Sequence, residues 1–255
     1  MRFITNEPAL MVGRTLVIAD LHLGMERELF RKGVRLPTQT PRILQHVLKL
    51  VKETRCSELV IIGDLKHNIV GAEWDEKQEL IRFIEEIKKH VPVRLIKGNH
   101  DGAIESYLDV PVSPGSGFAV GNVWLFHGHA KPGKGSERCS TLIMGHVHPI
   151  IEFTDSLGGR MQEKVWVRGT LDTKQELVIM PAFSHLLGGV DVREGLLGPM
   201  KKHLAVGQAK VYLLDSLCIG TIGDLSEASH RRKKGPKTAK RKTGRPSGAR
   251  RSRII

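Results

Sequence analysis

Residues 93–101 read VRLIKGNHD, a short apolar run that leads directly into the polar residues Gly98, Asn99, His100 and Asp101. Four other runs have the same form: TLVIAD at 15–20, ELVIIGD at 58–64, VWLFHGH at 123–129 and TLIMGH at 141–146. Continuous apolar runs of four or five residues are typical of strands that are buried on both faces. The polar residues that follow each run are therefore expected at the ends of buried strands.

Helical patterns separate the early runs. Residues 41–52, PRILQHVLKLVK, carry apolar side chains at helical spacing, with Thr40 as the expected N-cap and proline at the first helical position. A second helix is expected from about residue 75 to residue 89. Strands that alternate with helices indicate a layered α/β domain. After Pro149 the pattern changes to short strands joined by Gly-rich turns, which predicts a second sheet packed on the first.

The composition excludes several classes of protein. A chain of 255 residues with 40% hydrophobic and 26% charged residues is long enough for a sizeable core and is not disordered throughout. No stretch approaches the roughly 18 apolar residues that cross a membrane, and the first 15 residues lack the apolar segment of a signal peptide. The three cysteines, Cys56, Cys139 and Cys218, lie far apart and predict reduced thiols. We therefore expect a cytoplasmic protein without a disulfide scaffold.

The positive charge is concentrated at one end of the chain. The net charge is +13, and residues 226–255 hold 12 Lys/Arg and one acidic residue, while the rest of the chain has 28 basic and 26 acidic residues. A folded domain is expected over 1–224, followed by a disordered Lys/Arg-rich tail over 225–255. The basic stretch 231–253 suits nucleic-acid phosphates, because each neutralised phosphate releases counterions. The alternative is a solvated tail without a partner.

The residues at the strand ends are metal-ligand types. The five clusters are DLH at 20–22, GD at 63–64, GNHD at 98–101, HGH at 127–129 and GHVHP at 145–149. Ligand sites in open α/β sheets lie beyond the carboxyl ends of strands, so the five clusters are expected to converge. Carboxylate, amide and imidazole ligands together suit Mn²⁺, Fe²⁺ or Zn²⁺ better than Mg²⁺. Two ions about 3.5–4 Å apart, bridged by one carboxylate, would use all five clusters. A single cluster of this kind is a weak signal, whereas five in this order are specific.

The order of these motifs resembles the calcineurin-like metallophosphoesterase superfamily over roughly residues 1–222. The strings ADLHLGMERELFRKGVRLP at 19–37, GDLKH at 63–67 and MPAF with a Gly-Gly pair at 180–189 also resemble two narrower groups. These are the archaeal phosphoesterases related to the SbcD nuclease and the bacterial DNA-ligase-associated metallophosphoesterases. The resemblance implies a four-layer αββα sandwich of two mixed β-sheets flanked by helices, with a dinuclear site at the sheet edge.

The resemblance also implies a role for each motif residue. One metal ion would be held by Asp20, His22, Asp64 and His148, and the other by Asp64 as the bridge with Asn99, His127 and His146. His100 resembles the catalytic histidine, which protonates or hydrogen-bonds the leaving oxygen, and Asp101 would orient its ring. Many members have GDxxDR where this chain has Lys66 and His67. These two residues are predicted to bind substrate phosphate, with a structural role as the alternative, and activity on phosphoproteins is not expected.

Three functions fit this set of motifs. The first is a phosphodiesterase that acts on nucleic acid, most simply DNA in repair or processing, with two divalent ions. Mn²⁺ is the expected metal, and Fe²⁺, Zn²⁺ and Ni²⁺ are alternatives. The second is the same chemistry on small nucleotides or phosphomonoesters, with a non-specific tail. The third is a metal-binding scaffold that docks a repair protein without catalysis, and the complete ligand set together with the His100–Asp101 pair argues against it.

Overall fold

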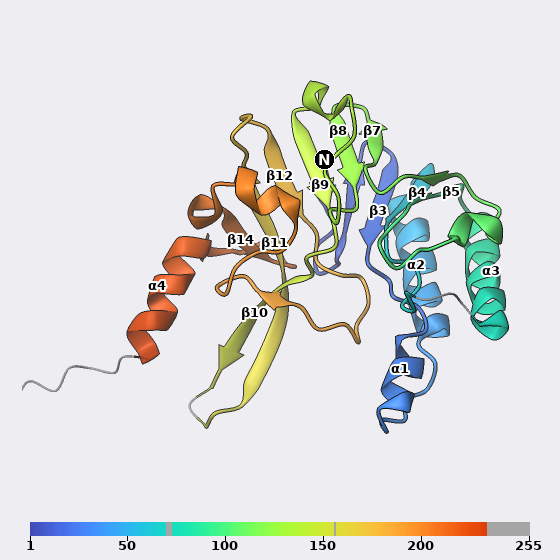
Figure 1. Ribbon diagram of the computed structural model, residues 1–255, viewed down its shortest axis with the longest axis horizontal. Helices are drawn as coiled ribbons and strands as arrows, with labels where there is room; N and C mark the ends of the chain where they lie inside the picture. Colours follow the sequence, from blue (N-terminus) through green and yellow to red (C-terminus); the bar gives the residue numbers. More distant parts are fainter. Residues whose placement is uncertain (70–72, 156, 234–255) are drawn as a thin grey trace, which may run out of the picture.

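Two β-sheets pack face to face in the computed structural model, which describes residues 1–69, 73–155 and 157–233. Figure 1 shows helices α2 and α3 on the outer side of one sheet and α4 on the outer side of the other. The helices are α1 (Met25–Arg31), α2 (Thr40–Thr54), α3 (Trp74–Lys88) and α4 (Ile222–Lys233). Helix α3 matches the expected second helix, but α2 has Gln39 as its N-cap, so the prediction of Thr40 was one residue late.

The first sheet carries three of the five motif strands. Its order is β1-β2-β3-β4-β5-β6, made of Arg2–Phe3, Ala9–Val12, Thr15–Ala19, Glu58–Ile62, Val93–Ile96 and Val112–Ser113. Strands β3 to β6 are parallel, while β2 is antiparallel to its neighbours β1 and β3. Ala19 pairs with Ile62, and Ile62 pairs with Ile96. The three strands therefore end level, and the residues that follow them lie at one edge.

The second sheet carries the other two motif strands. Its order is β13-β10-β11-β12-β9-β8-β7, with β14 beside β11 and β15 beside β14. These strands are β7 (Phe118–Val120), β8 (Val123–Phe126), β9 (Thr141–Met144), β10 (Pro149–Thr154), β11 (Arg160–Thr170), β12 (Glu176–Ile179), β13 (Val190–Asp191), β14 (Lys210–Leu213) and β15 (Cys218–Thr221). The sequence pattern predicted that this sheet starts after Pro149, but the sheet also contains β7, β8 and β9. The prediction missed these strands because the buried parallel strands β8 and β9 have the same apolar pattern as those of the first sheet.

Three apolar layers hold the sandwich together. One lies between the first sheet and α2 and α3, and it includes Leu16 and Ile18. The second lies between the two sheets and includes Val17 and Ala19, which belong to the same strand, β3, as Leu16 and Ile18. The third lies under α4 and two short 3₁₀ helices, Pro199–His203 and Val206–Gln208, on the outer face of the second sheet. Successive side chains of a strand point to opposite faces, so β3 contributes to two layers, and the predicted four-layer αββα fold is confirmed.

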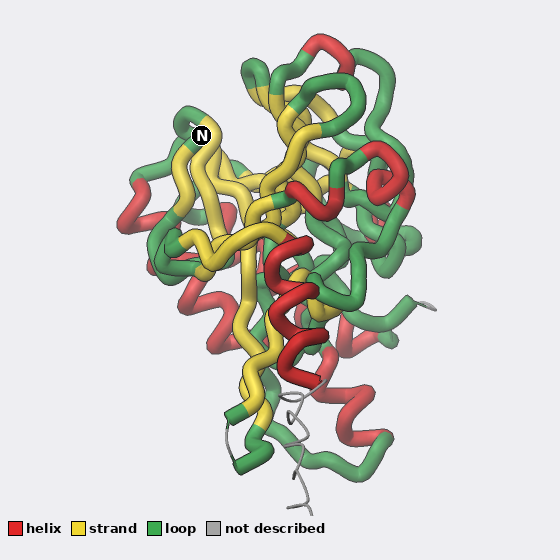
Figure 2. Tube along the Cα trace, turned by 90° about the vertical axis from the view of Figure 1, so that its left-hand side faces the viewer, coloured by secondary structure: helices red, strands yellow, loops and turns green. Residues whose placement is uncertain are grey.

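Helix α4 corrects the predicted start of the tail. Residues 225–233 were expected to be disordered, but they continue the helix that starts at Ile222. Oγ1 of Thr221 donates to the Asp224 carboxylate and accepts the Asp224 backbone N–H, a reciprocal pair of contacts at the helix N-terminus. Ile222 and Leu225 pack on the outer apolar layer, and Figure 2 shows the helix lying alongside the strands. The rest of the predicted tail, 234–255, lies outside the described residues.

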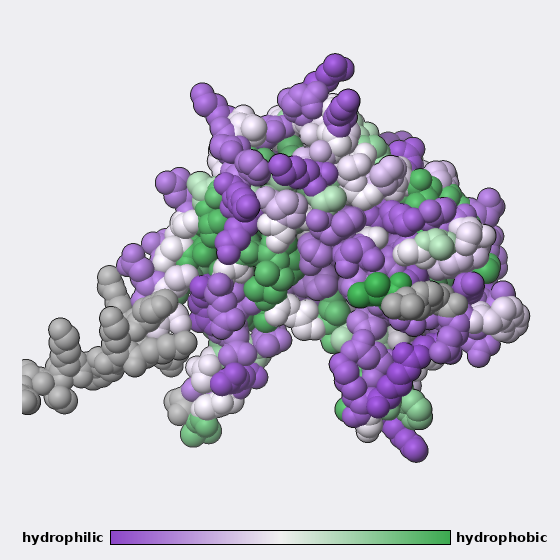
Figure 3. Space-filling model, viewed as in Figure 1, coloured by the Kyte–Doolittle hydropathy of each residue, from purple (hydrophilic) through white to green (hydrophobic). Residues whose placement is uncertain are grey.

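The motif edge of both sheets lies in a hollow of the surface. In Figure 1 the arrowheads of β3 and β8 point to the same end of the molecule, between α1 and the long β10–β11 hairpin. Figure 3 shows that these two elements project on either side of a hollow, so the strand ends face a recess that is open to solvent. Among the described residues, no helix combines the length and apolar character needed to cross a membrane.

Candidate metal centre

The backbone at the strand ends is strained in a regular way. Five of the seven predicted ligands have a positive φ between 47° and 69°: Asp20, His22, Asp64, His146 and His148. Such a conformation costs a non-glycine residue about 1–3 kcal/mol and persists only where surrounding contacts impose it. Here the turns after β3 and β4 hold each other, since the N–H of Asp20 donates to the Gly63 carbonyl and that of His22 to the Asp64 carbonyl. Left-handed turns of this kind aim consecutive side chains into one space.

The first cluster contains Asp20, His22, Asp64 and His148, whose ligand atoms all lie within 4.8 Å of one another. Nε2 of His148 is 3.3 Å from Oδ1 of Asp20, and Nε2 of His22 is 3.5 Å from Oδ2 of Asp64. Among the residues that the structure describes, three of these atoms are buried without a hydrogen-bond partner: Asp20 Oδ1, His22 Nε2 and His148 Nε2. Buried polar atoms are almost always paired. These three unpaired atoms lie within 4.8 Å of one another, so together they fit a bound cation.

The second cluster shares Asp64 with the first and adds His127 and His146. Nε2 of His127 lies 3.3 Å from Oδ2 of Asp64 and 3.2 Å from Oδ1 of Asn99. The structure thus brings all seven predicted ligands into two adjoining clusters with one common carboxylate. The mixed oxygen and nitrogen donors fit divalent first-row metals, and which ion binds stays a prediction.

The protonation states suit cation binding. Burial raises the pKa of Asp64, but hydrogen bonding and charge from His127 outweigh it, so the pKa stays well below its usual range. Burial lowers the pKa of His22 to about 3, which keeps this ring neutral at pH 7. Burial also lowers the pKa of His127, yet the carboxylates of Asp64 and Asp20 prevail and raise it to about 9. A cation held by Asp64, His127 and His146 would take the place of the His127 proton as partner of the carboxylates.

Two motif glycines are required by the ligands that pack against them. A Cβ on Gly98 would lie 2.1 Å from Oδ1 of Asp64, and a Cβ on Gly145 would lie 2.5 Å from Oδ2 of Asp20. Both distances are far shorter than any van der Waals contact between heavy atoms, so neither position has room for a side chain. The glycines of GNHD and GHVHP therefore allow the two carboxylates to approach the neighbouring strand ends closely.

His100 is held over the shared carboxylate. Its backbone N–H donates to Oδ1 of Asp64 at 2.9 Å, and its ring packs edge-on against that of His22, with ring centroids 4.8 Å apart. Nδ1 of His100 is hydrogen-bonded to the backbone carbonyl of His67. A carbonyl only accepts, so Nδ1 carries the proton and Nε2 is the nitrogen available to a substrate.

Asp101 does not orient the His100 ring, contrary to the prediction. Its Oδ2 accepts the backbone N–H of Gly98 at 2.8 Å, and its Oδ1 accepts that of Lys66 at 3.3 Å. The carboxylate is fully buried and ties the loop after β5 to the loop after β4. Burial raises the pKa of Asp101 to about 6. Asp101 is thus a positioning group for the backbone, and the carbonyl of His67 takes the place expected for it.

The structure gives Lys66 and His67 internal partners, which do not favour the predicted phosphate contacts. Lys66 is fully buried, and its Nζ donates to the backbone carbonyl of Asn68, so the amine does not face an incoming substrate. Both ring nitrogens of His67 are engaged, Nδ1 with His22 at 3.2 Å and Nε2 with Glu28 at 2.6 Å. Sequence reasoning assigned these side chains to substrate because they follow the shared aspartate, but the turn directs both of them into the protein.

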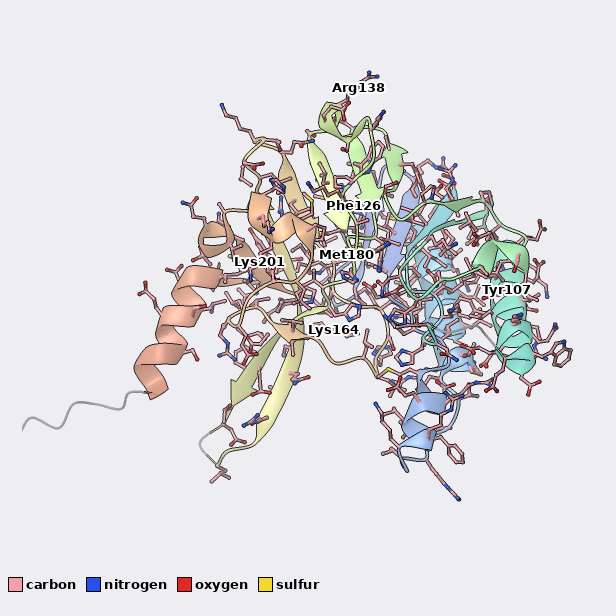
Figure 4. The ribbon with its side chains drawn as sticks, viewed as in Figure 1. Tyr107, Phe126, Arg138, Lys164, Met180 and Lys201 are labelled. Atoms are coloured by element: carbon pink, nitrogen blue, oxygen red, sulfur yellow. The ribbon has the colours of Figure 1, made fainter. Side chains whose placement is uncertain are left out.

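Lys164 is a supporting residue that sequence reasoning missed. Its Nζ donates to the carbonyls of Ala182 and Ser184, both at 2.6 Å, and lies 3.4 Å from that of Phe183. The same loop donates back to the first cluster, since the N–H of Ser184 reaches the Asp20 carbonyl at 3.2 Å. Figure 4 labels Lys164 in the middle of the molecule. The MPAF string at 180–183 marks this loop in the sequence, whereas nothing near Lys164 indicates its partner.

Residues 13–168 match the model of the calcineurin-like phosphoesterase family. The chain belongs to this family. The matched region contains all seven candidate ligands and His100. A calcineurin-like phosphoesterase with this clustered ligand set is a metal-dependent hydrolase of phosphoric esters, which sets aside the non-catalytic scaffold. Membership of the narrower SbcD-related group stays a prediction.

A solved nuclease structure shows the same fold at low sequence identity. The nuclease MPE of Pseudomonas putida is 24% identical with a TM-score of 0.55, and the match covers 79% of this chain and 85% of the nuclease. Yfce, a phosphoesterase from E. coli, is 15% identical with a TM-score of 0.39, over 81% of this chain and 96% of the other. No curated protein sequence matches the chain. The likeness to the nuclease supports the fold of this calcineurin-like phosphoesterase.

Proposed function

We propose that this calcineurin-like phosphoesterase hydrolyses phosphodiester bonds in DNA, in repair or processing, with two Mn²⁺ ions. The observation that carries the proposal is the carboxylate of Asp64, which belongs to both ligand clusters and accepts the backbone N–H of His100. One group thus connects both predicted metal positions with the predicted general acid. Three free cysteines fit the reducing cytoplasm as the place of action.

The residues of the chain divide the chemistry between them. Divalent ions bound at the two clusters supply Lewis acidity at the phosphoryl group and activate the attacking water. Nδ1 of His100 donates to the carbonyl of His67, which leaves Nε2 facing the substrate. With both ring nitrogens protonated, the imidazolium would donate from Nε2 to the departing oxygen and leave the proton on Nδ1 in place. The buried carboxylate of Asp101 holds the loop that carries His100. General acid catalysis of this kind typically contributes 10²–10⁴-fold in rate.

Two observations favour a polymeric substrate over a small one. The strand ends face a hollow between α1 and the β10–β11 hairpin that is open to solvent, which leaves room for a chain to pass through (Figure 3). Residues 234–255 add nine Lys/Arg without an acidic residue, a charge pattern that suits a phosphate backbone. The structural neighbour from Pseudomonas putida is named a nuclease, which agrees with the proposal.

A substrate panel tests the proposed activity. Protein stripped with a chelator and reloaded with Mn²⁺ is given labelled single- and double-stranded DNA and RNA, mononucleotides, cyclic nucleotides and bis(p-nitrophenyl) phosphate. We expect turnover of DNA and of the chromogenic diester, and a loss of about 10²-fold or more in His100→Asn. His90→Asn, at an exposed residue outside the site, is the matched control. Turnover confined to mononucleotides or phosphomonoesters would show that the substrate is a small phosphoester and not DNA.

A truncation tests the role proposed for the basic segment. Helix α4 reaches Lys233, so the cut is made after this residue to keep the folded body intact. We expect the shortened chain to retain hydrolysis of the chromogenic diester while its affinity for DNA falls and depends less steeply on salt. Equal DNA affinity and equal salt dependence in both chains would remove the segment from the proposal.

A further inference from the structure

His67 lies between a predicted metal ligand and a carboxylate, in a chain of hydrogen bonds that the catalytic assignment does not use. Its Nε2 is 2.6 Å from Oε2 of Glu28 on α1, and its Nδ1 is 3.2 Å from Nδ1 of His22. The three side chains come from α1, from the turn after β4 and from the turn after β3. The side chain of His22 is fully buried, that of His67 is largely buried, and that of Glu28 is half-exposed.

The chemistry of the partners restricts where the protons lie. The Glu28 carboxylate only accepts, so Nε2 of His67 carries a proton and donates it. Nδ1 of a neutral His67 then has a lone pair, and Nδ1 of His22 must be the donor in the contact between the rings. His22 is left with its lone pair on Nε2. This atom is buried 3.5 Å from Oδ2 of Asp64 and has no hydrogen-bond partner in the described part of the chain. This is the tautomer that a metal ligand at this position requires.

The backbone holds the two rings at this separation. The N–H of Leu23 donates to the Leu65 carbonyl and the N–H of His67 donates to the Leu23 carbonyl, both at 2.9 Å. The turns after β3 and β4 therefore form a short parallel ladder, in which Leu23 pairs with Lys66. His22 and His67 lie on opposite sides of this ladder, so the backbone hydrogen bonds fix the separation of the two residues.

We propose that His67 and Glu28 are positioning residues that hold the His22 ring in the tautomer and orientation of a ligand in the first cluster. The inference rests on the metal-dependent part of the proposed function and not on its substrate. Groups that hydrogen-bond a metal-ligating histidine raise its basicity and restrict its rotation, and their loss typically lowers metal affinity or activity 10–100-fold. The histidine three residues after Asp64 thus supports a metal ligand.

A metal titration tests this assignment apart from catalysis. Mn²⁺ is titrated into the chelator-treated full-length protein and into His67→Ala, Glu28→Ala and Glu28→Gln, with calorimetry and with the electron paramagnetic resonance of free Mn²⁺. We expect two ions in every variant, with the affinity of one weakened 10–100-fold in His67→Ala and less in Glu28→Ala. Glu28→Gln, whose amide oxygen still accepts from Nε2 of His67, is expected to restore most of the affinity. Lys32→Ala, which removes the other partner of Glu28, is the control.

The possible outcomes separate this inference from the proposed function. Ligand atoms of His22, His67 and His100 also lie within 4.8 Å of one another, so a third ion in the wild type that is absent in His67→Ala would make His67 a ligand and overturn the assignment. Unchanged Mn²⁺ affinity in His67→Ala with a raised KM for the chromogenic diester would return His67 to substrate binding. A wild type that binds no ion would refute the metal-dependent function itself.

Discussion

Asp64 and His100 are joined by a hydrogen bond of 2.9 Å from the backbone N–H of His100 to Oδ1 of the carboxylate. Because the donor is a backbone group, the GNHD loop after β5 is positioned directly by the carboxylate that the two clusters of candidate ligands share. The loop that carries the predicted general acid is therefore placed relative to the predicted metals through the Asp64 side chain. Changes at either end of this contact are expected to alter both metal binding and catalysis.

Replacement of the shared carboxylate tests the dinuclear arrangement. In Asp64→Asn the bridge loses its charge, so we expect at most one bound Mn²⁺ in place of two. Hydrolysis of the chromogenic diester is expected to fall by about 10²-fold or more. Asp109→Asn, which removes an exposed carboxylate paired with Lys88, is the matched control and is expected to bind two ions. Two tightly bound ions in Asp64→Asn would show that this carboxylate is not the bridge.

Gly98→Ala tests the close approach of the two strand ends. The added Cβ would lie 2.1 Å from Oδ1 and 2.2 Å from the backbone nitrogen of Asp64, so the GNHD loop or the carboxylate must move. We expect a loss of about 1–3 kcal/mol in unfolding free energy together with weaker Mn²⁺ binding. Gly207→Ala, where nothing lies within 4 Å of the new Cβ, is the control. A variant with native stability and native Mn²⁺ affinity would contradict this packing.

Thr221→Ala tests the start of α4. The variant loses the hydroxyl that contacts both the carboxylate and the backbone N–H of Asp224. We expect a loss of about 1 kcal/mol in unfolding free energy, as is typical for an N-cap, with little change in diester hydrolysis. Thr5→Ala, at an exposed residue, is expected to change the urea unfolding midpoint much less. Equal midpoints for both variants would mean that this pair of contacts does not stabilise the helix.

The lowered pKa of Lys164 predicts that the free energy of unfolding depends on pH in the alkaline range. Burial lowers the pKa of Lys164 from its ordinary value of 10.5 to about 8. Between these values the unfolded chain holds the proton that the folded protein has lost, so this residue makes the folded state more stable as pH rises through the window. Urea unfolding in chelator at pH 7.5, 9 and 10.5 is expected to show this rise relative to Lys164→Met. Lys52→Met, on the exposed face of α2, should follow the wild type at each pH, and a flat difference for Lys164→Met would contradict the shift.

The sequence predicted the fold and the site ligands because both follow local rules. The apolar runs at 15–20, 58–64 and 93–101 correspond to β3, β4 and β5, and their parallel register brings the polar residues after them to one edge. The same reasoning extends to β8 and β9, which carry His127 and His146. A polar motif that follows a buried strand can be recognised in the sequence without knowledge of its contacts. The motifs that supply the candidate ligands are all of this type.

Side-chain partners followed no local rule. Glu28 and His67 lie 39 residues apart, and Lys164 is separated by 18 to 20 residues from the carbonyls it contacts. The sequence assigned Lys66 and His67 to the substrate and Asp101 to the His100 ring, since adjacency in a motif was the only guide. The predicted tail was wrong up to Lys233 for a related reason: the apolar side chains of α4 are few, and they stabilise a helix only because the second sheet offers a surface to cover.

The strand-end motifs by themselves therefore predicted a layered α/β domain with converging clusters of ligand residues, and their resemblance to the calcineurin-like family singled out the seven candidate metal ligands. The residue counts located the positive charge near one end. The tertiary structure alone decided which oxygen each histidine faces, which side chains are turned inward and where the folded body continues into α4. Spacing along a strand sets the side of the sheet that a residue occupies. Hydrogen-bond partners depend on how close separate turns come, and that distance is established only when both sheets are packed.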